Sequence, residues 1–186
     1  MSNALEENHM KYSTGDNIIL IGMPAVGKST VGVLLAKRMG YGFIDTDLTI
    51  QTGEQRRLHQ IIDAQGISAF CDLEAAYVQR LEAHRSVIAT GGSVVYRHQT
   101  MAYLDNLGII VFLDIELDQL MHRLVDMEKR GVVCAPDQTI DDLYAERRPL
   151  YQKYADAIVS CSALQPDAVA AKVTTVIETV ASFASV

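Results

Sequence analysis

The segment at residues 22–30, GMPAVGKST, constrains the fold more than any other part of the chain, because it matches the pattern G-x-x-x-x-G-K-[ST]. The apolar run at residues 18–21 precedes it and is typical of a buried parallel strand, and residues 28–38 are predicted to form the helix that follows. In such a loop, backbone N–H groups and the start of the helix face an anion, which predicts a nucleotide phosphate site. A turn that only caps a helix is the alternative, although the pattern arises by chance in roughly one chain of this length in a hundred.

The residue types in this loop suit a triphosphate. Lys28 is expected to reach the β- and γ-phosphates, while the hydroxyl group of Ser29 binds Mg²⁺. Two cationic centres would then lie where negative charge shifts during phosphoryl transfer. The residues expected to bind the nucleotide are Gly22, Ala25, Val26, Gly27, Lys28, Ser29 and Thr30.

Charge and composition exclude several classes of partner. The 186 residues include 16 Lys and Arg against 23 Asp and Glu, a net charge of −7, so the chain has no general attraction for a nucleic-acid backbone. No apolar run approaches the roughly 18 residues of a membrane span. The three cysteines are widely spaced and lack a C-x-x-C pair, which fits reduced thiols. We therefore expect a cytoplasmic protein, most simply a monomer, without nucleic-acid or membrane partners.

Apolar runs that alternate with helical patterns predict right-handed βαβ units and a parallel sheet. Further strands are predicted at residues 41–45, 86–90, 109–113 and 157–159. Helices are predicted at about residues 67–83, 97–107, 117–127 and 166–183, with shorter ones within residues 47–62. The helix after Thr139 is expected to be interrupted or kinked near Pro149.

Residues 16–183 are predicted to form a single domain, because 49% hydrophobic content supports one sizeable core. Residues 1–15 resemble a tag remnant and are expected to form a flexible N-terminus outside the fold. Residues 128–138 show neither helical periodicity nor strand alternation, so we expect a mobile lid there. The five histidines show no metal-ligand spacing and are assigned to solvent or packing.

Polar residues follow two of the predicted strands at the point where each strand ends. Asp45 and Asp47 follow one strand, and Gly91 and Gly92 follow the next. Ligands of open parallel sheets collect at this edge, so either carboxylate can lie beside the γ-phosphate, and Asp47 is the natural general base. One aspartate can instead cap the next helix, which does not exclude catalysis, and an isolated glycine pair is more often a turn.

With the phosphate loop, the Asp-x-Asp pair, the Gly-Gly loop and a late Arg-x-Pro-Leu-Tyr in this order, the chain resembles the shikimate kinase family over about residues 16–180. The resemblance implies an α/β fold of three layers, the P-loop kinase fold, with a five-stranded parallel sheet, helices on both faces and a mobile lid. It also implies an acceptor-binding segment at about residues 47–83.

The resemblance also assigns roles at the edge of the sheet. It places Asp45 with Ser29 as the residues that hold Mg²⁺, and it makes Asp47 the carboxylate that holds the acceptor hydroxyl and takes its proton. Gly91 and Gly92 match the family's glycine loop, where backbone N–H groups approach the acceptor.

The same resemblance assigns roles to three arginines. Arg130 matches the lid arginine that closes on the phosphates, Arg123 the arginine packed on the adenine, and Arg147 the arginine that faces the acceptor's carboxylate. An isolated arginine on such helices is usually a solvated surface residue, so the joint order of the motifs carries these assignments.

The chain departs from the family pattern in its acceptor-binding half. The family has Phe-Arg-x-x-Glu where this chain has Cys71 in place of the arginine, and a cysteine cannot supply the planar two-donor group that grips shikimate's carboxylate. The loss of such a bond typically costs about 1.5–3 kcal/mol. Ser93 replaces the third glycine of the glycine loop and adds a hydroxyl near the acceptor. Arg56 and Arg57 are two candidates for a replacement of the missing arginine.

Three functions are compatible with these residues. The first is an ATP- and Mg²⁺-dependent kinase that converts shikimate to shikimate 3-phosphate, with Lys28, Asp47 and Arg130 as catalytic residues. The second is a kinase of the same fold that acts on another small hydroxylated metabolite, as Cys71 suggests. The third is a non-catalytic nucleotide-binding module. A screen for ADP release across small alcohols separates the three.

Overall fold

The fold is built on one five-stranded sheet, seen in a computed structural model that describes residues 16–125 and 138–183. All strand pairs are parallel, and the strand order is β2-β3-β1-β4-β5. The strands are β1 (Asn17–Ile21), β2 (Gly42–Asp45), β3 (Ser86–Ala89), β4 (Gly108–Asp114) and β5 (Ala157–Ser160). The central strand β1 pairs through Ile18 with Val87 of β3 and Ile109 of β4. The predicted five-stranded parallel sheet is confirmed.

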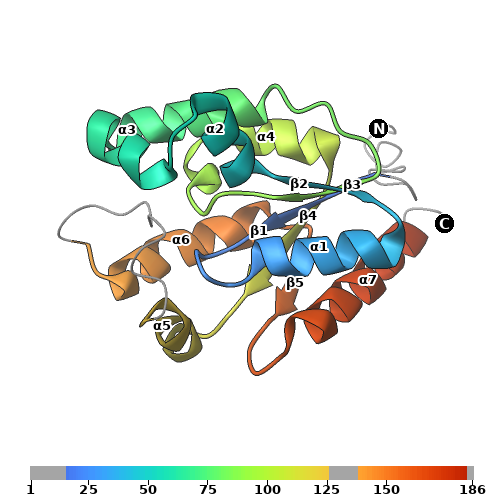
Figure 1. Cartoon of the computed structure of the whole chain (residues 1–186). Coiled ribbons are helices and arrows are strands. Elements are labelled where there is room, and N and C mark those ends of the chain that lie inside the picture. The colour runs from blue at the N-terminus through green and yellow to red at the C-terminus, as the bar shows by residue number, and fades with distance from the viewer. Residues whose placement is uncertain (1–15, 126–137, 184–186) are drawn as a thin grey trace, which may run out of the picture.

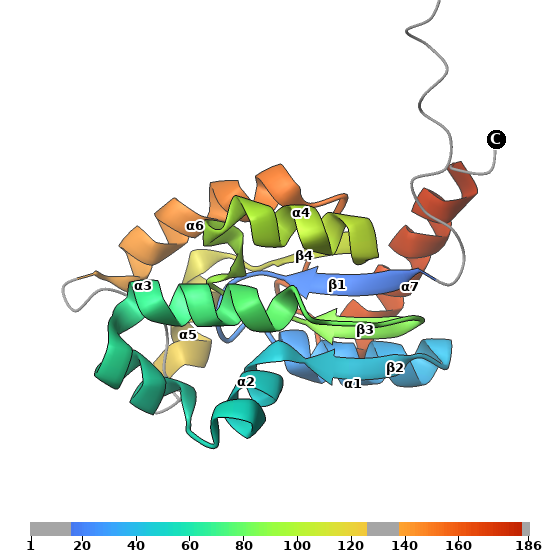
Figure 2. The ribbon, with the colours of Figure 1, turned by 90° about the horizontal axis from the view of Figure 1, so that it is seen from above.

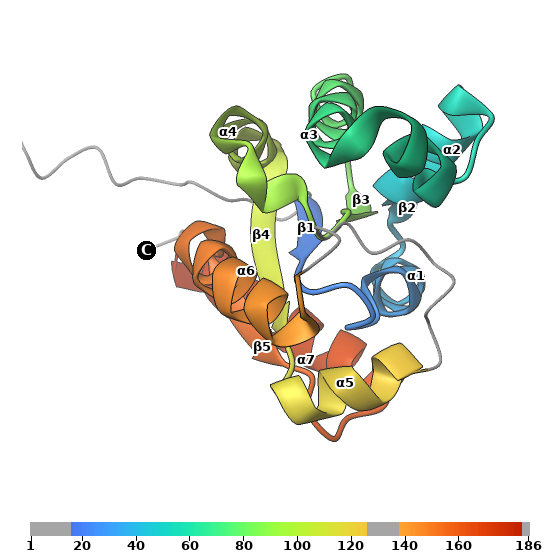
Figure 3. The same ribbon diagram turned by 90° about the vertical axis from the view of Figure 1, so that its left-hand side faces the viewer.

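Helices cover both faces of this sheet and give the three predicted layers (Figure 1; Figure 3). On one face, α1 (Lys28–Met39) packs against α7 (Pro166–Phe183), while α4 (His98–Leu107) and α6 (Ile140–Tyr154) cover the other. The remaining helices are α2 (Thr46–Glu54), α3 (Leu58–Val78), α5 (Leu117–Val125) and the short 3₁₀ helix η1 (Val94–Tyr96). Apart from Gln138, the expected lid lies outside the described residues.

The central strands are buried on both sides. All residues from 18 to 21 are at most 1% exposed, because helices cover both faces of the parallel sheet. Phe112 of β4 stacks on Tyr151 of α6 with ring centroids 5.2 Å apart. None of the helices in the described part of the chain combines the length and the apolar character that crossing a membrane requires.

The second and third helices differ from the sequence-based prediction. Helix α3 begins at Leu58 rather than near residue 67, and its backbone breaks from helical geometry at Gly66, where φ is 81°. It ends at Val78 rather than near residue 83, because the N–H groups of Arg80 and Leu81 bond to carbonyls only three residues back. The expected short helices correspond to α2 and the part of α3 before Gly66.

Helix α6 runs from Ile140 to Tyr154 and includes Pro149, so of the two expected forms the interruption is wrong, while the kink stays a prediction. Thr139 caps its start, as predicted, by accepting a hydrogen bond from the N–H of Asp142 at 3.1 Å. Pro149 lacks the N–H that would bond four residues back, and it lies on the exposed side of the helix.

The segments that follow the strands lie together at the edge of the sheet formed by the carboxyl ends of the strands. All five strands point the same way, and α2, α3 and α5 lie beyond their carboxyl ends (Figure 2). The loops after β1, β2 and β3 therefore meet at this edge, as the order of the motifs predicted.

At the opposite edge, Asn17 joins the starts of three strands. Its side chain is 3% exposed, and its Nδ2 donates to the carbonyl oxygens of Ala83 at 2.7 Å and Leu107 at 2.9 Å. Its Oδ1 accepts a hydrogen bond from the N–H of Ser86 at 3.1 Å. This one amide thus holds the residues that begin β3 and β4 against β1.

Replacing Asn17 with alanine is expected to lower the free energy of unfolding by about 2 kcal/mol, because three buried polar groups lose their partner. Urea denaturation measures the change. Asn106→Ala removes an exposed amide and serves as the matched control. Equal midpoints for the two variants would contradict the role given to Asn17.

Candidate functional site

The loop after β1 folds around the amine of Lys28. The Nζ atom donates to the carbonyl oxygens of Gly22 at 2.7 Å and Met23 at 2.9 Å. Gly22 has φ of 144°, and a Cβ there would lie 2.6 Å from the carbonyl oxygen of Leu113, so β4 leaves no space for a side chain. Burial lowers the pKa of Lys28 to about 8, and the negative charge of Asp47 opposes this shift.

A pocket of about 650 Å³ opens at this loop. The pocket brings together the nucleotide loop at residues 22–30, the aspartates at 45 and 47, the glycine loop at residues 91–92 and Arg147 of α6. The predicted residues that line it are Ala25, Gly27, Lys28, Ser29, Thr30, Asp45, Asp47, Gly91, Gly92 and Arg147. Gly22 and Val26 do not line the pocket, and Val26 is instead packed in the core at 2% exposure. Both residues lie where the loop packs against the rest of the protein.

Asp45 both caps α2 and lines the pocket. Its carboxylate accepts a hydrogen bond from the N–H of Leu48 at 3.1 Å, which confirms that one member of the aspartate pair is a helix cap. The second carboxylate oxygen and the exposed hydroxyl of Ser29 are hard oxygen donors that fit Mg²⁺. In residues 16–125 and 138–183 no cluster of three or more His, Cys, Asp or Glu could hold a metal by itself. A site with few protein ligands, completed by phosphate oxygens and water, is the usual arrangement for Mg²⁺.

Asp47 lies in the first turn of α2, half-buried beside the amine of Lys28. Removal of its carboxylate from water raises its pKa to about 6. The charge of Lys28 acts in the opposite direction, and repulsion from Asp45 adds to the increase. The carboxylate of Asp47 is therefore ionised at neutral pH and is more basic than an ordinary aspartate, which suits a general base.

A third carboxyl group, for which no role was predicted, borders Asp47. Glu74 of α3 is 1% exposed, and its Oε2 accepts a hydrogen bond from the hydroxyl of Ser93 at 2.7 Å. Its Oε1 is buried and has no hydrogen-bond partner among the described residues. Burial raises the pKa of Glu74 to about 7, opposed by the bond from Ser93 and reinforced by Asp47. The hydroxyl group of Ser93, which was expected near the acceptor, thus donates its hydrogen bond to Glu74.

Gly91 separates these two carboxyl groups. A Cβ at this position would overlap Oε1 of Glu74 and would lie 2.9 Å from Oδ1 of Asp47. The N–H of Gly91 donates to the hydroxyl oxygen of Thr46 at 3.1 Å, which ties the glycine loop to the start of α2. The absent side chain at Gly91 is therefore what allows both carboxyl groups to lie beside the loop.

Arg147 projects from α6 into the pocket and is only 1% exposed. Its Nε donates to the hydroxyl oxygen of Tyr96 at 2.8 Å, and its guanidinium lies over that ring, 4.9 Å from the centroid. A Cβ at Gly92 would lie 3.1 Å from its Nη1, so the guanidinium closely approaches the glycine loop. One turn further along α6, the hydroxyl of Tyr151 donates to the carbonyl oxygen of Gly92 at 2.6 Å.

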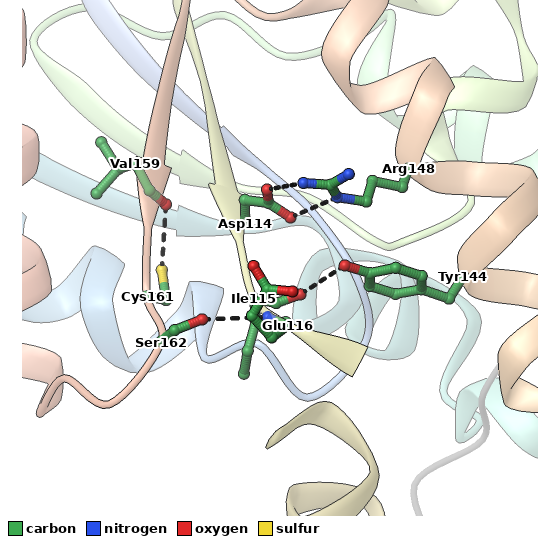
Figure 4. Close-up of polar contacts among 8 residues, drawn as sticks. All are labelled: Asp114, Ile115, Glu116, Tyr144, Arg148, Val159, Cys161 and Ser162. Atoms are coloured by element: carbon green, nitrogen blue, oxygen red, sulfur yellow. Dashed lines mark hydrogen bonds and ion pairs between the residues drawn. The ribbon is translucent and has the colours of Figure 1, made fainter. Parts of the chain in front are cut away.

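The neighbouring Arg148 fixes α6 to the end of β4. Its guanidinium donates from Nε to Oδ1 of Asp114 at 3.1 Å and from Nη2 to Oδ2 at 2.7 Å (Figure 4). The hydroxyl of Tyr144 on the same helix donates to the carbonyl oxygen of Ile115 at 2.9 Å. A two-point contact of this kind sets the rotation of the helix as well as its position, and so it orients Arg147.

Of the two other predicted arginines, the structure describes Arg123 alone. Arg123 of α5 does not line the pocket, and its Nη1 donates to the carbonyl oxygen of Val26 at 2.9 Å. Its contact with an adenine stays a prediction. Arg130 lies outside the described residues.

Helices α2 and α3 supply further pocket residues, all of them within the predicted acceptor-binding segment at about residues 47–83. Those without a predicted role are Leu48, Gln51, Leu58, His59 and Phe70. His59, which was assigned to solvent or packing, is half-buried and lines the pocket. No local pattern could have indicated this.

Cys71 is a small buried hydrophobe. It is 4% exposed and packs in an apolar cluster with Ile50, Leu58, Ile61 and Phe70. Burial raises the pKa of its thiol, and the charge of Glu74 raises it further. The position therefore carries no charge for binding an acceptor.

Comparison with known proteins matches this chain to one family. The family model described as shikimate kinase matches residues 24–178. The shikimate kinase of Rippkaea orientalis is 37% identical over 173 residues, which cover 91% of this chain and 92% of that protein. The shikimate kinase of Thermodesulfovibrio yellowstonii is 35% identical over 160 residues, covering 84% and 92%.

Solved structures show the same similarity. The shikimate kinase from Acinetobacter baumannii in complex with shikimate superposes with a TM-score of 0.83 at 26% identity and covers 90% of this chain and 95% of that one. The shikimate kinase from Aquifex aeolicus has a TM-score of 0.73 at 30% identity, with coverage of 89% and 98%. The similarity thus spans both the sheet and the segments that line the pocket.

Proposed function

The chain belongs to the shikimate kinase family, and on this premise we propose that it transfers the γ-phosphoryl group of ATP to a hydroxyl group of shikimate. The product is shikimate 3-phosphate. The observation that supports this proposal most is the single pocket shared by Lys28, Asp47, the glycine loop and Arg147. These are the groups that a phosphate chain and a hydroxylated carboxylic acid require side by side.

On the acceptor side, Asp47 holds the hydroxyl group and accepts its proton as the oxygen attacks phosphorus. The proton ends on the carboxylate, whose pKa of about 6 makes the transfer easier than to an ordinary aspartate. The backbone of Gly91 and Gly92 approaches the acceptor, and the guanidinium of Arg147 faces its carboxylate.

On the nucleotide side, the amine of Lys28 moves from the carbonyl oxygens of its own loop to the β- and γ-phosphate oxygens. Ser29 and Asp45 would hold Mg²⁺, which would supply positive charge against the triphosphate. We assign the adenine contact to Arg123 and closure on the phosphates to Arg130, which lies outside the described residues.

All of these groups belong to one chain, so we propose that residues 16–183 act as a single domain and that a monomer is the active form. The free thiols of Cys71 and Cys161 support a cytoplasmic location, where thiols stay reduced.

A coupled assay of ADP release, run with shikimate, gluconate and homoserine as acceptors, tests the proposal. Shikimate is expected to give the highest kcat/KM. The uncharged, buried Cys71 favours a second candidate, a kinase for another hydroxylated metabolite, and a higher kcat/KM with gluconate or homoserine would establish it. Binding of ATP and Mg²⁺ without ADP release from any acceptor would identify a non-catalytic module.

The pH profile of kcat/KM is expected to be bell-shaped. Activity rises as pH increases through the Asp47 pKa of about 6, because only the ionised carboxylate accepts a proton. It falls above the Lys28 pKa of about 8, because the neutral amine no longer attracts the triphosphate. Steady-state assays across this range measure the profile. Glu74→Gln removes the intervening ionisation and is expected to keep both limbs, and a flat profile would contradict the assignment.

A further inference from the structure

The wall that α2 and α3 contribute to the pocket carries one permanent positive charge among its described lining residues. That charge belongs to Arg57, which immediately precedes α3. Its other lining residues include the acidic Asp45 and Asp47 and the apolar Leu58 and Phe70. A negatively charged part of an acceptor is repelled by the aspartates, so it can be bound on this wall only near Arg57.

The backbone of Arg57 is fixed while its side chain is available. Its N–H donates to Oε1 of Gln60 at 3.0 Å, and its carbonyl oxygen accepts a hydrogen bond from the N–H of Ile61 at 3.2 Å. Its exposed guanidinium makes no hydrogen bond or ion pair with any other residue in the described ranges. The side chain of the preceding Arg56 is not available in this way, because its Nη2 donates to the carbonyl oxygen of Gln60 at 2.8 Å. Arg56 also does not line the pocket.

The two guanidinium groups of the pocket therefore come from different elements, Arg57 from the start of α3 and Arg147 from α6. A planar guanidinium donates two parallel hydrogen bonds to one carboxylate. An acceptor whose hydroxyl is held by Asp47 can then be oriented at a second point by its carboxylate.

We propose that Arg57 binds the carboxylate of the acceptor together with Arg147 and thereby sets the preference of this kinase for hydroxy acids over neutral alcohols. This inference rests on the proposed function and specifies how its acceptor is recognised. It gives Arg57 a role in acceptor binding, where Cys71 supplies no charge.

The test compares Arg57→Ala with Arg56→Ala, a matched control that removes the same charge from the adjacent residue. Arg57→Ala is expected to raise KM for shikimate by about tenfold, the low end for a charge-assisted bond at an exposed site, with kcat little changed. KM for ATP stays at the wild-type value. Arg57→Lys is expected to recover the affinity only in part, because an ammonium group lacks the two-donor geometry.

A neutral acceptor isolates the role of the carboxylate. With the methyl ester of shikimate, wild-type protein and Arg57→Ala are expected to have the same KM. An unchanged KM for shikimate in Arg57→Ala, an equal increase in Arg56→Ala, or an undiminished effect with the ester would each overturn the proposal.

Direct binding keeps this test separate from that of the proposed function. Calorimetric titration of shikimate in the presence of ADP and Mg²⁺ needs no turnover. If wild-type protein binds shikimate but releases no ADP, the kinase proposal fails, and weaker binding by Arg57→Ala alone still supports the role of Arg57. If Arg57→Ala binds shikimate as tightly as wild type, the role of Arg57 is excluded whatever the turnover.

Discussion

Replacing Asp47 with asparagine is expected to lower kcat by about 10²- to 10⁴-fold, the usual contribution of a general base. The amide keeps the shape of the side chain and can still accept a hydrogen bond from the acceptor hydroxyl, but it cannot take the proton. Nucleotide affinity is expected to fall far less than kcat, because the phosphate loop is left intact, although loss of the Asp47 charge lowers the pKa of Lys28 further from its wild-type value of about 8. Assays of ADP release measure kcat, and calorimetric titration measures nucleotide binding.

Asp72→Asn provides the matched control for this variant. Asp72 is exposed, pairs with Arg97 at 2.8 Å and does not line the site, so the same change there is expected to leave kcat intact. Near-normal turnover in Asp47→Asn would remove Asp47 from the mechanism. A loss of nucleotide affinity as large as the loss of turnover would show that Asp47 acts on the phosphate loop instead.

Gly91→Ala is expected to lower both the stability and the activity of the protein. The added methyl group would overlap Oε1 of Glu74 and press on Asp47, while the bond from the N–H of Gly91 to Thr46 keeps the loop from moving away. Inserting a carbon atom into such a packed position typically costs about 1–3 kcal/mol. Urea denaturation measures the stability, and kcat reports the displacement of Asp47.

The double variant Gly91→Ala/Glu74→Ala checks this explanation, because it removes the group that the new methyl meets. Its loss of stability is expected to be smaller than the sum of the two single losses, since Glu74→Ala creates the space that Gly91→Ala fills. Additive losses would mean that Gly91 is required for a reason other than its contact with Glu74.

The sheet and the nucleotide loop could be predicted because their signals are local. The run at residues 18–21 is apolar throughout, since both of its faces are covered, and the motif at residues 22–30 follows it directly. The cap at Asp45 and the start of α6 at Thr139 are also local signals, and both were found. The residues after each strand could be placed together because parallel strands share one carboxyl edge.

The remaining parts of the site depend on contacts between distant segments. Glu74 and Ser93 are 19 residues apart, and a lone glutamate in a helix gives no sign that it is buried. Arg57 was one of two candidates in the sequence, but only the structure distinguishes it from Arg56, which does not line the pocket. No local pattern places His59 there. The length of α3 was mispredicted for a related reason, since apolar residues continue past the point where three-residue turns replace the helix at Arg80.

The two adjacent arginines of α6 make that helix intolerant of insertions and deletions. Arg147 serves the pocket while Arg148 grips Asp114, and successive residues of a helix differ in direction by about 100°. A single residue gained or lost between Thr139 and Arg147 would force the chain to satisfy either the capped start or the anchored end, but not both. Substitutions of the exposed side chains in this segment are therefore expected to be tolerated, whereas a change in its number of residues is not.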